Sequence, residues 1–282
     1  MSKKLLYFSF ILLVLSIASI SKAELVAYYS LDEGSGNIAA DGSGNGYDGI
    51  PEPATGNFSW VQGKDGAALR FAGTGAPVYC GTYDPAKGTG QFTISCWVNW
   101  EGADGNYQGI LSKRDGYTAG AVRYNLETAN TAAGGGAANL SFTLTADNNR
   151  IWSGYSPPLN TWDMVTVTYD GTNAILYVNG ELNSGPTALS FDDGEDAAVL
   201  IGTANRGGSS PFNGAIDEVY IFSTALSVEE INSLMNGELK PNLNPGAATK
   251  PVPGNKAEEI SIDVGEISWT PGEFIAANGY SV

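Results

Sequence analysis

Residues 162–180 read WDMVTVTYDGTNAILYVNG. Apolar and polar residues alternate with a period of two through 162–169 and again through 175–178, which is the pattern of half-buried β-strands. Asp170-Gly171 separates the two runs, and Asn179-Gly180 follows the second. Both dipeptides tolerate the positive φ angles that tight hairpin turns require. The segment therefore predicts three antiparallel strands in succession.

The same alternation recurs on both sides of this hairpin, from Leu25 to Phe222. In the segment 92–98, the residues Phe92, Ile94, Cys96 and Val98 share one face, which we expect to point into the core. The other predicted strands are 25–30, 67–72, 76–80, 92–100, 108–114, 121–127, 139–145, 198–202 and 213–222. The 37 glycines among 282 residues suit many short strands joined by tight turns. The predicted fold class is all-β.

One short helix and a linker follow the last strand. Ser227 precedes the apolar-periodic segment 228–235, and Glu230 completes a capping box with it. Gly237 stands where a helix commonly ends. Residues 237–259 contain four prolines among Gly, Asn and Lys, and predict an extended linker. Residues 260–282 read as the opening strands of a further β domain, too short to bury a core of their own.

The first residues predict a secretory leader. Lys3 and Lys4 precede an apolar run over residues 5–20, and Ser21-Lys22-Ala23 offers small residues where a signal peptidase cuts, which places cleavage before Glu24. The alternative is a membrane anchor, for which the run is short against the roughly 20 apolar residues of a spanning helix. We expect residues 24–236 to form one extracellular domain, without membrane attachment after cleavage.

Charge and composition exclude several functions. The formal net charge of −16 repels phosphate backbones and anionic lipids, so nucleic acid and membrane surfaces are poor partners. The chain contains no histidine, which excludes a Ser-His-Asp triad, a Cys-His pair and a histidine-ligated zinc ion. A surplus of carboxylates can still serve divalent cations, which take oxygen ligands.

The only two cysteines are Cys80 and Cys96. A secreted chain with an even cysteine count favours one disulfide, which would require their two strands to be neighbours. The alternative is two buried free thiols.

Five segments in a fixed order resemble the laminin G-like jelly roll of the concanavalin A-like lectin and glucanase superfamily. They are 29–36 with 41–46 (YSLDEGSG and DGSGNG), 63–71 (GKDGAALRF), 92–98 (FTISCWV), 162–180, and 212–222 (FNGAIDEVYIF) with the helix behind it. The resemblance covers roughly residues 24–236 and implies two antiparallel sheets packed face to face. Residues 260–282 also resemble the start of a fibronectin type III-like module, which implies further domains downstream.

The resemblance also implies a structural calcium ion. It assigns Asp217 as the carboxylate ligand and the turn at Gly66 as a carbonyl donor, while Asp32 and Asp41 lie in Gly-rich turns that could aim oxygens at the same ion. The alternative is that Asp41 caps its own turn and Asp217 accepts backbone amides. The acidic run 192–196 is a second place for calcium, or a solvated loop.

Superfamily members that cleave glycans use carboxylates closely spaced on one strand, and no predicted strand here offers them. Asp217 and Glu218 are adjacent and are expected to point to opposite faces of the sheet. A sugar-binding surface would instead use aromatic rings with polar neighbours, although aromatic residues also fill cores. The candidate ligand-binding residues are Trp100, Tyr107, Tyr117, Arg123, Trp152 and Tyr155. Trp97 and Trp162 lie within strands and are expected to pack.

The sequence therefore predicts a secreted, non-catalytic module that binds an extracellular glycan or protein and carries calcium. The alternatives are an accessory domain of a larger secreted carbohydrate-active enzyme and, third, a carboxylate-based glycoside hydrolase.

Overall fold

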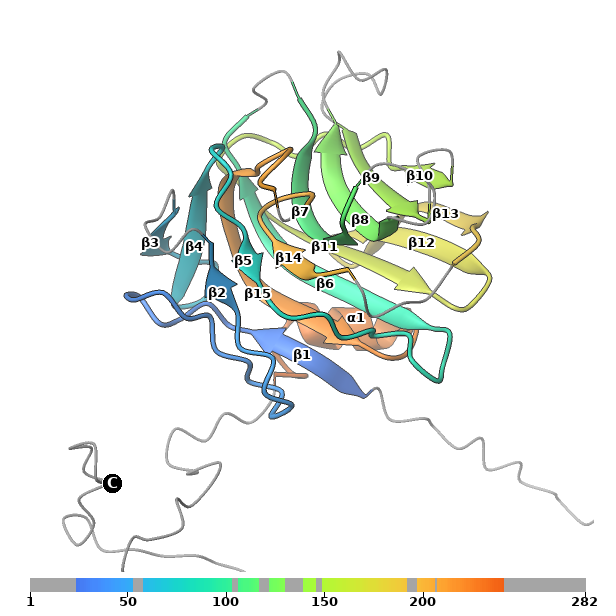
Figure 1. The fold of residues 1–282 in the computed structure, drawn as a ribbon. Helices are drawn as coiled ribbons and strands as arrows, with labels where there is room; N and C mark the ends of the chain where they lie inside the picture. The colour runs from blue at the N-terminus through green and yellow to red at the C-terminus, as the bar shows by residue number, and fades with distance from the viewer. Residues whose placement is uncertain are drawn as a thin grey trace, which may run out of the picture.

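The computed structural model describes residues 24–52, 58–102, 106–116, 122–129, 139–145, 149–191, 197–205 and 207–240. Within these residues the chain forms two antiparallel β-sheets and one helix (Figure 1). The sheets pack face to face as a jelly-roll sandwich, which confirms the predicted fold class. The predicted leader and the residues beyond Lys240, including the fibronectin-like segment, lie outside the described residues.

The first sheet has eight strands. Its order is β13-β12-β11-β6-β15-β4-β3, and β1 also pairs with β15, beside β4. The strands are β1 (Leu25–Tyr29), β3 (Phe58–Gln62), β4 (Ala67–Ala72), β6 (Phe92–Trp100), β11 (Trp162–Tyr169), β12 (Asn173–Val178), β13 (Glu181–Ala188) and β15 (Asn213–Phe222). The first strand of the domain thus pairs with the last.

The second sheet has seven strands in the order β10-β9-β8-β7-β14-β5-β2. They are β2 (Ile50–Pro51), β5 (Val78–Tyr79), β7 (Gln108–Arg114), β8 (Val122–Ala129), β9 (Asn139–Leu144), β10 (Arg150–Trp152) and β14 (Val199–Ile201). Strands β7 to β10 follow one another along the chain as an antiparallel meander.

The main core fills the space between the sheets. Residues Phe92, Ile94, Cys96 and Val98 of β6 all belong to it, as their shared face predicts. From the seven-stranded sheet, Tyr124 and Leu126 of β8 and Phe142 of β9 face them, among other side chains. Burial of this apolar surface, at about 25 cal/mol per Å², is the main term that holds the sheets together.

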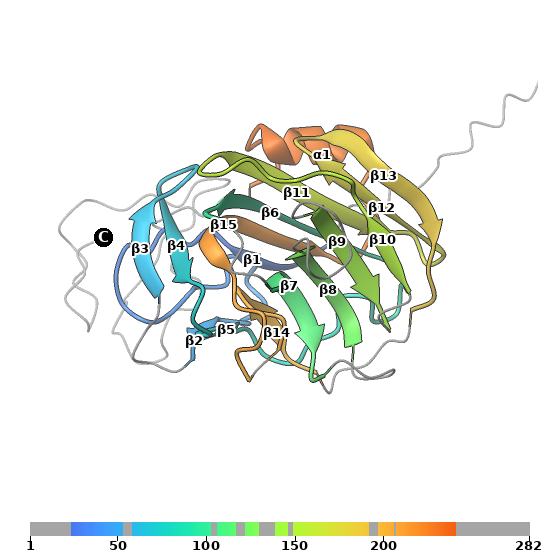
Figure 2. The same cartoon turned by 90° about the horizontal axis from the view of Figure 1, so that it is seen from above.

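Helix α1 (Val228–Met235) packs on the outer face of the eight-stranded sheet, away from the other sheet (Figure 2). Ser227 caps it and forms the predicted capping box with Glu230. Ile231 and Leu234 are buried against a second apolar cluster that includes Trp97 and Met164. Trp97 therefore packs, as predicted, although on the outer side of the sheet.

The predicted hairpin is confirmed. Strands β11 and β12 pair from Val165↔Val178 to Tyr169↔Ala174. Asp170 Oδ1 accepts backbone hydrogen bonds from Thr172 and Asn173 and so holds the first turn. Asn179 and Gly180 adopt φ angles of 50° and 77°, and β13 follows as the third strand. This local chemistry explains why the hairpin could be predicted from the sequence.

The structure corrects the expected orientation of Glu218. The register of β15 against β6 shifts between Asp217↔Trp97 and Tyr220↔Ser95, which marks a β-bulge. Glu218 adopts a φ of 51°, in the left-handed region. The bulge lets Ile216 and Val219 both face the core, so that Asp217 and Glu218 lie together on the outer face instead of on opposite faces.

The predicted disulfide is wrong. Cys80 directly follows β5 of the seven-stranded sheet, whereas Cys96 lies in β6 of the eight-stranded sheet, and both are free buried thiols. The two strands are not neighbours in a sheet, which was the condition for the bridge. Burial raises the pKa of each thiol to about 12.

Three short strands, β2, β3 and β10, are absent from the predicted set. Two of them span only two or three residues, and β3 is a partly exposed edge strand, so none carries a clear alternation. Helix α1, the one helix among the described residues, lacks the length and apolarity to cross a bilayer.

Candidate functional site

Asp217 meets the turn between β3 and β4. Its Oδ2 accepts backbone hydrogen bonds from Lys64 (2.8 Å) and Asp65 (3.1 Å). A Cβ atom at Gly63 would lie 2.6 Å from the same oxygen, so glycine is needed for the turn to approach so closely. Asp217 Oδ1 is buried and has no hydrogen-bond partner among the described residues.

This carboxylate fits a cation. Burial raises the pKa of Asp217 to about 8, and the negative charges of Glu218 and Asp32 act in the same direction, against the two amide hydrogen bonds. A buried carboxyl with one unpartnered oxygen and acidic neighbours lacks a compensating positive charge. The predicted calcium ligand Asp217 therefore has the donor chemistry that the resemblance implies.

Asp32 and Gly66 lie at the same turn. Asp32 Oδ1 accepts a hydrogen bond from the backbone of Ala67 (2.8 Å), and a Cβ at Gly66 would come within 2.0 Å of that oxygen. Gly66 also has a φ of 57°, which favours glycine. Its carbonyl already accepts from Gln62 Nε2 at 2.7 Å and from the backbone of Gly63. The structure thus brings Asp217, Asp32 and Gly66 together.

Asp41 instead forms its own turn. Its Oδ1 accepts from the backbones of Tyr28 and Ser43, and its Oδ2 accepts from Ser43 Oγ and the backbone of Tyr47. Four hydrogen bonds account for both oxygens, which favours the turn-forming alternative. Within the described residues, no three acidic or cysteine side chains converge as a ready metal cluster. The acidic run 192–196 lies outside these residues.

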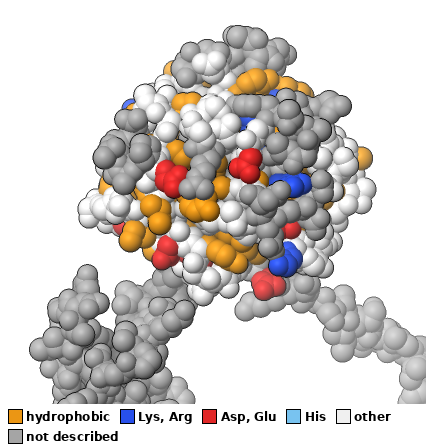
Figure 3. Space-filling model, in the orientation of Figure 1, with side chains coloured by type: hydrophobic (Ala, Val, Ile, Leu, Met, Phe, Trp, Pro, Cys, Tyr) orange, Lys and Arg blue, Asp and Glu red, His pale blue; other side chains and the backbone are white. Residues whose placement is uncertain are grey.

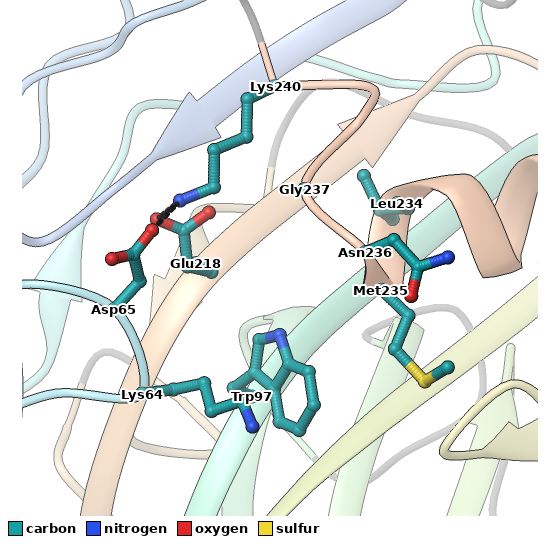
Figure 4. Close-up of a pocket in the computed structure, with 9 residues that line it drawn as sticks. All are labelled: Lys64, Asp65, Trp97, Glu218, Leu234, Met235, Asn236, Gly237 and Lys240. Carbon is teal, nitrogen blue, oxygen red and sulfur yellow. Dashed lines mark hydrogen bonds and ion pairs between the residues drawn. The ribbon is translucent and has the colours of Figure 1, made fainter.

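A pocket of about 200 Å³ lies between the β3–β4 turn and the end of α1, and Glu218 is among the residues that line it (Figure 4). Lys240 Nζ, which also lines the pocket, bridges Asp65 (2.5 Å) and Glu218 (2.9 Å). Lys64 Nζ lies 4.3 Å from the ring centroid of Trp97. Asp65 and Glu218 in the lining of this pocket are already paired with Lys240, so their charges are not free for a ligand.

The outer face of the seven-stranded sheet carries a different set of side chains. In β8 the residues Arg123, Asn125 and Glu127 alternate with the core residues Tyr124 and Leu126, so they point away from the core. In β9, Ser141 and Thr143 alternate in the same way, and Arg150 and Trp152 flank the core residue Ile151 of β10. We call the set Asn125, Glu127, Ser141, Thr143, Arg150 and Trp152 the outer polar face.

Glu127 is the centre of the outer polar face. Its carboxylate accepts hydrogen bonds from Asn125 Nδ2 (2.5 Å) and Ser141 Oγ (3.4 Å), and it lies 3.2 Å from Arg150 Nη1. Burial raises its pKa, while the charges of Arg150 and Arg114 and the bond from Asn125 lower it. The result is a fixed, almost dry carboxylate that orients its neighbours.

The edge of this face is aromatic. The guanidinium of Arg150 lies 5.2 Å from the ring centroid of Tyr107 and 5.0 Å from that of Trp152. Trp152 is 39% exposed, and only 9% of the Arg150 side chain is accessible. An arginine held by Glu127 between two rings gives a rigid platform with one indole open to solvent.

Of the six predicted ligand residues, Tyr107, Arg123 and Trp152 lie on or beside the outer polar face. Trp100 does not, because it is buried in the core and its Nε1 donates to Gln108 Oε1 at 2.8 Å. Tyr155 packs against the core, and its hydroxyl donates to Asp163. Tyr117 lies outside the described residues.

Sequence reasoning missed Glu127, Arg150, Asn125 and Thr143. The available signal was the alternation in residues 122–128, where polar residues occupy every second position of a strand with an apolar inner face. Figure 3 faces this sheet and shows described acidic and basic side chains scattered among apolar ones. This view gives no sign of the continuous basic surface that nucleic acid would require.

Two antiparallel sheets packed face to face as a jelly roll define the chain as a β-sandwich domain. Residues 72–232 match the laminin G family model of the concanavalin A-like lectin/glucanases superfamily. The chain belongs to this family.

Solved structures share the fold at low sequence identity. Domain 4 of an extracellular GH43 arabinanase from Geobacillus stearothermophilus, in complex with arabinotriose, is 21% identical with a TM-score of 0.57, over 76% of this chain and 98% of that one. The binding domain of Paraclostridial Mosquitocidal Protein 1 is 16% identical with a TM-score of 0.59, over 76% and 52%.

A sialidase from Trypanosoma rangeli, in complex with 2,3-difluoro-KDN, is 15% identical with a TM-score of 0.57, over 77% of this chain and 33% of the sialidase. The chain therefore spans about a third of the sialidase. Curated proteins give no sequence match. At these identities the likeness concerns the fold.

Proposed function

We propose that this protein is a non-catalytic carbohydrate-binding module whose ligand site is the outer polar face. The observation that carries the proposal is the platform of Tyr107, Arg150 and Trp152 beside the fixed carboxylate of Glu127. Aromatic rings cover the apolar C–H side of a sugar ring, and nearby polar groups take its hydroxyls. The exposed indole of Trp152 supplies the aromatic ring, and the polar side chains around Glu127 supply the groups for the hydroxyls.

The fold of the arabinanase domain with its bound arabinotriose supports a glycan as ligand in preference to a protein. The low share of the sialidase that this chain covers also supports an accessory role within a larger secreted protein. A catalytic role is not favoured, because Glu127 is the only carboxylate of the outer polar face within the described residues. Hydrolysis of a glycosidic bond normally requires two acids across the scissile bond.

Trp152→Ala tests the ligand site. Native affinity electrophoresis of the full chain against soluble glycans should show retardation that the substitution removes, because a stacked aromatic ring provides much of the contact area. Ile38→Ala is the matched control, since Ile38 is a similarly exposed apolar residue (52%) outside the outer polar face. Equal retardation of the two variants and the unchanged chain would show that the ligand binds elsewhere.

We also propose that a calcium ion stabilises the turn between β3 and β4. Asp217 would provide a carboxylate oxygen, and Asp32 and Gly66 are the nearest predicted oxygen donors. A bound calcium ion would supply the positive charge that the buried Asp217 carboxylate lacks. Its role would be structural, because the turn is on the eight-stranded sheet and the outer polar face is on the other.

Chelation tests the calcium proposal. EDTA should lower the melting temperature of the full chain, and added calcium should restore it, because binding to the folded state alone stabilises that state. Asp217→Asn keeps the size and one acceptor oxygen, and should remove the difference between EDTA and calcium. If EDTA and calcium give the same melting temperature in the unchanged chain, the calcium proposal fails while the glycan proposal stands.

A further inference from the structure

Asn125 and Thr143 are direct cross-strand partners on the outer polar face. Both are fully buried. Asn125 Oδ1 and Thr143 Oγ1 nevertheless have no hydrogen-bond partner within the described part of the chain. Buried polar atoms are rarely left unsatisfied, because the loss of water is then not offset. Asn125 Oδ1 and Thr143 Oγ1 therefore leave hydrogen-bonding capacity for a polar group that the described residues do not supply.

The orientation of Asn125 is fixed by its neighbour. Its amide nitrogen donates to Glu127 Oε2 at 2.5 Å. A carboxylate only accepts hydrogen bonds, so the amide must turn its nitrogen toward Glu127 and its oxygen away. The group left unsatisfied on Asn125 is therefore an acceptor. The hydroxyl of Thr143 can donate as well as accept.

We propose that Asn125 and Thr143 form a subsite for one hydroxyl group of a neutral sugar. This inference rests on the proposed function and specifies the ligand class. A sugar hydroxyl donates a hydrogen bond to Asn125 Oδ1 and accepts a hydrogen bond from the hydroxyl of Thr143. One ligand atom thus satisfies both buried groups.

Anionic groups do not fit this pair. A carboxylate, sulfate or phosphate oxygen only accepts, so it leaves Asn125 Oδ1 unsatisfied. The charge of Glu127 adds no further discrimination, because Arg150 lies 3.2 Å from it and the charge of Arg114 also acts on it. The overall charge of −16 opposes anionic ligands at longer range. The pair therefore takes a hydroxyl in preference to an anionic oxygen, and the net charge of the chain disfavours uronic, sialic and sulfated glycans as a whole.

The subsite lies beside the aromatic edge. Thr143 pairs with Arg150, and Ser141 pairs with Trp152, across the ladder between β9 and β10. Neighbouring strands are about 5 Å apart, which is close to the width of a sugar ring. A glycosyl unit stacked on Trp152 therefore comes within one strand of Thr143 and within two of Asn125.

Thr143→Val tests the subsite, because valine has the shape of threonine with a methyl group in place of the hydroxyl. In affinity electrophoresis of the full chain with neutral polysaccharides (arabinan, xylan, mixed-linkage β-glucan and galactomannan), the dissociation constant should rise roughly tenfold. The melting temperature should stay the same or rise, because the substitution removes an unpartnered buried hydroxyl.

Thr166→Val is the matched control. Thr166 is equally buried, but its hydroxyl hydrogen-bonds with Ser95 Oγ at 2.6 Å in the other sheet. This variant should lose stability and keep its affinity. A fall in stability for Thr143→Val with unchanged affinity would make Thr143 structural and overturn the inference.

The ligand class is tested with polygalacturonate, heparin and polysialic acid in the same gels. Retardation by the neutral glycans alone supports the subsite, and stronger retardation by the anionic glycans overturns it. If Trp152→Ala loses binding and Thr143→Val does not, the subsite is wrong and the proposed function stands. If the unchanged chain binds none of the seven glycans, both are wrong.

Discussion

At the scale of single residues, Glu218 is one of six described non-glycine residues with a positive φ. A left-handed φ of 51° in a strand normally belongs to glycine, and it costs conformational energy in a glutamate. The carboxylate is compensated by hydrogen bonds from Tyr28 (3.0 Å) and Tyr220 (2.5 Å) and by the ion pair with Lys240. The bulge places Asp217 and Glu218 on one face, where their charges concentrate at the β3–β4 turn.

The two cysteines should be inert in the folded protein. Both thiols are fully buried, and burial raises the pKa of each to about 12, so the reactive thiolate is scarce at neutral pH. Iodoacetamide should label neither residue in the native chain and both in guanidinium chloride, without any reductant. Intact mass measures this. Labelling in denaturant that requires prior reduction would reveal a disulfide.

Glu127 should make stability depend on pH. Burial raises the pKa of Glu127 above its ordinary value of 4.5, so the folded chain binds this proton more tightly than the unfolded chain does. Its contribution to the free energy of unfolding therefore falls as pH rises from about 4 through the raised pKa. Glu127→Gln should remove this contribution.

Thermal denaturation from pH 4 to 7 measures the effect as the difference between the unchanged chain and Glu127→Gln. The melting temperature of Glu127→Gln should rise relative to that of the unchanged chain as pH rises. Glu229→Gln, on the first turn of α1, is the control for an acidic residue outside the outer polar face. If the melting temperature of the unchanged chain instead rises relative to that of the variant, the ion pair with Arg150 outweighs burial in its effect on the pKa of Glu127.

At the scale of elements, local chemistry predicted the strongest features. The hairpin of β11 and β12 and the capped helix carry their turn and cap residues within a few positions of each other, so their structure depends little on distant contacts. The edge strands β2 and β10 depend on their pairing partners instead. Their few residues show no period, which is why the sequence did not reveal them.

The cap of α1 gives a prediction at this scale. Ser227→Ala removes the acceptor for the backbone of Glu230 and should lower the free energy of unfolding by about 1 kcal/mol. Ser233→Ala makes the same chemical change inside the helix, where alanine has the higher propensity, and should leave stability equal or slightly higher. Urea denaturation compares the two. Equal effects would mean that the capping box contributes nothing.

At the scale of the whole molecule, alternation and ordered motifs were enough to predict the sandwich. They were not enough for the outer polar face, because it combines side chains from β8, β9 and β10 whose alignment depends on register. The acidic turn was predicted in part, since Asp217, Asp32 and Gly66 meet there and Asp41 does not. Distant residues become neighbours only through pairing, which a single sequence does not display.

Lys240 connects the end of the domain to its middle. Lys240→Met should lower the melting temperature by roughly 2–4 °C, about 1 kcal/mol, because Glu218 is 3% exposed and loses its cation, while the 30% exposure of Lys240 weakens the pair. Asp65→Asn should cost less, since Asp65 is 68% exposed. Calorimetry gives both values. A larger loss for Asp65→Asn would mean that Lys240 acts mainly through the turn.

The pairing of the first strand with the last also determines how the domain would respond to tension. Leu25 lies opposite Phe222, and the backbone amide of Ser223 donates a hydrogen bond to the carbonyl of Glu24. A pull between Glu24 and Lys240 would first detach Lys240 and α1. It would then load the hydrogen bonds between β1 and β15 one after another, because Leu25 and Phe222 lie at the same end of this antiparallel pair. The other strand pairs would carry no load until β1 had separated from β15, so unfolding under tension would begin at this pair and at low force.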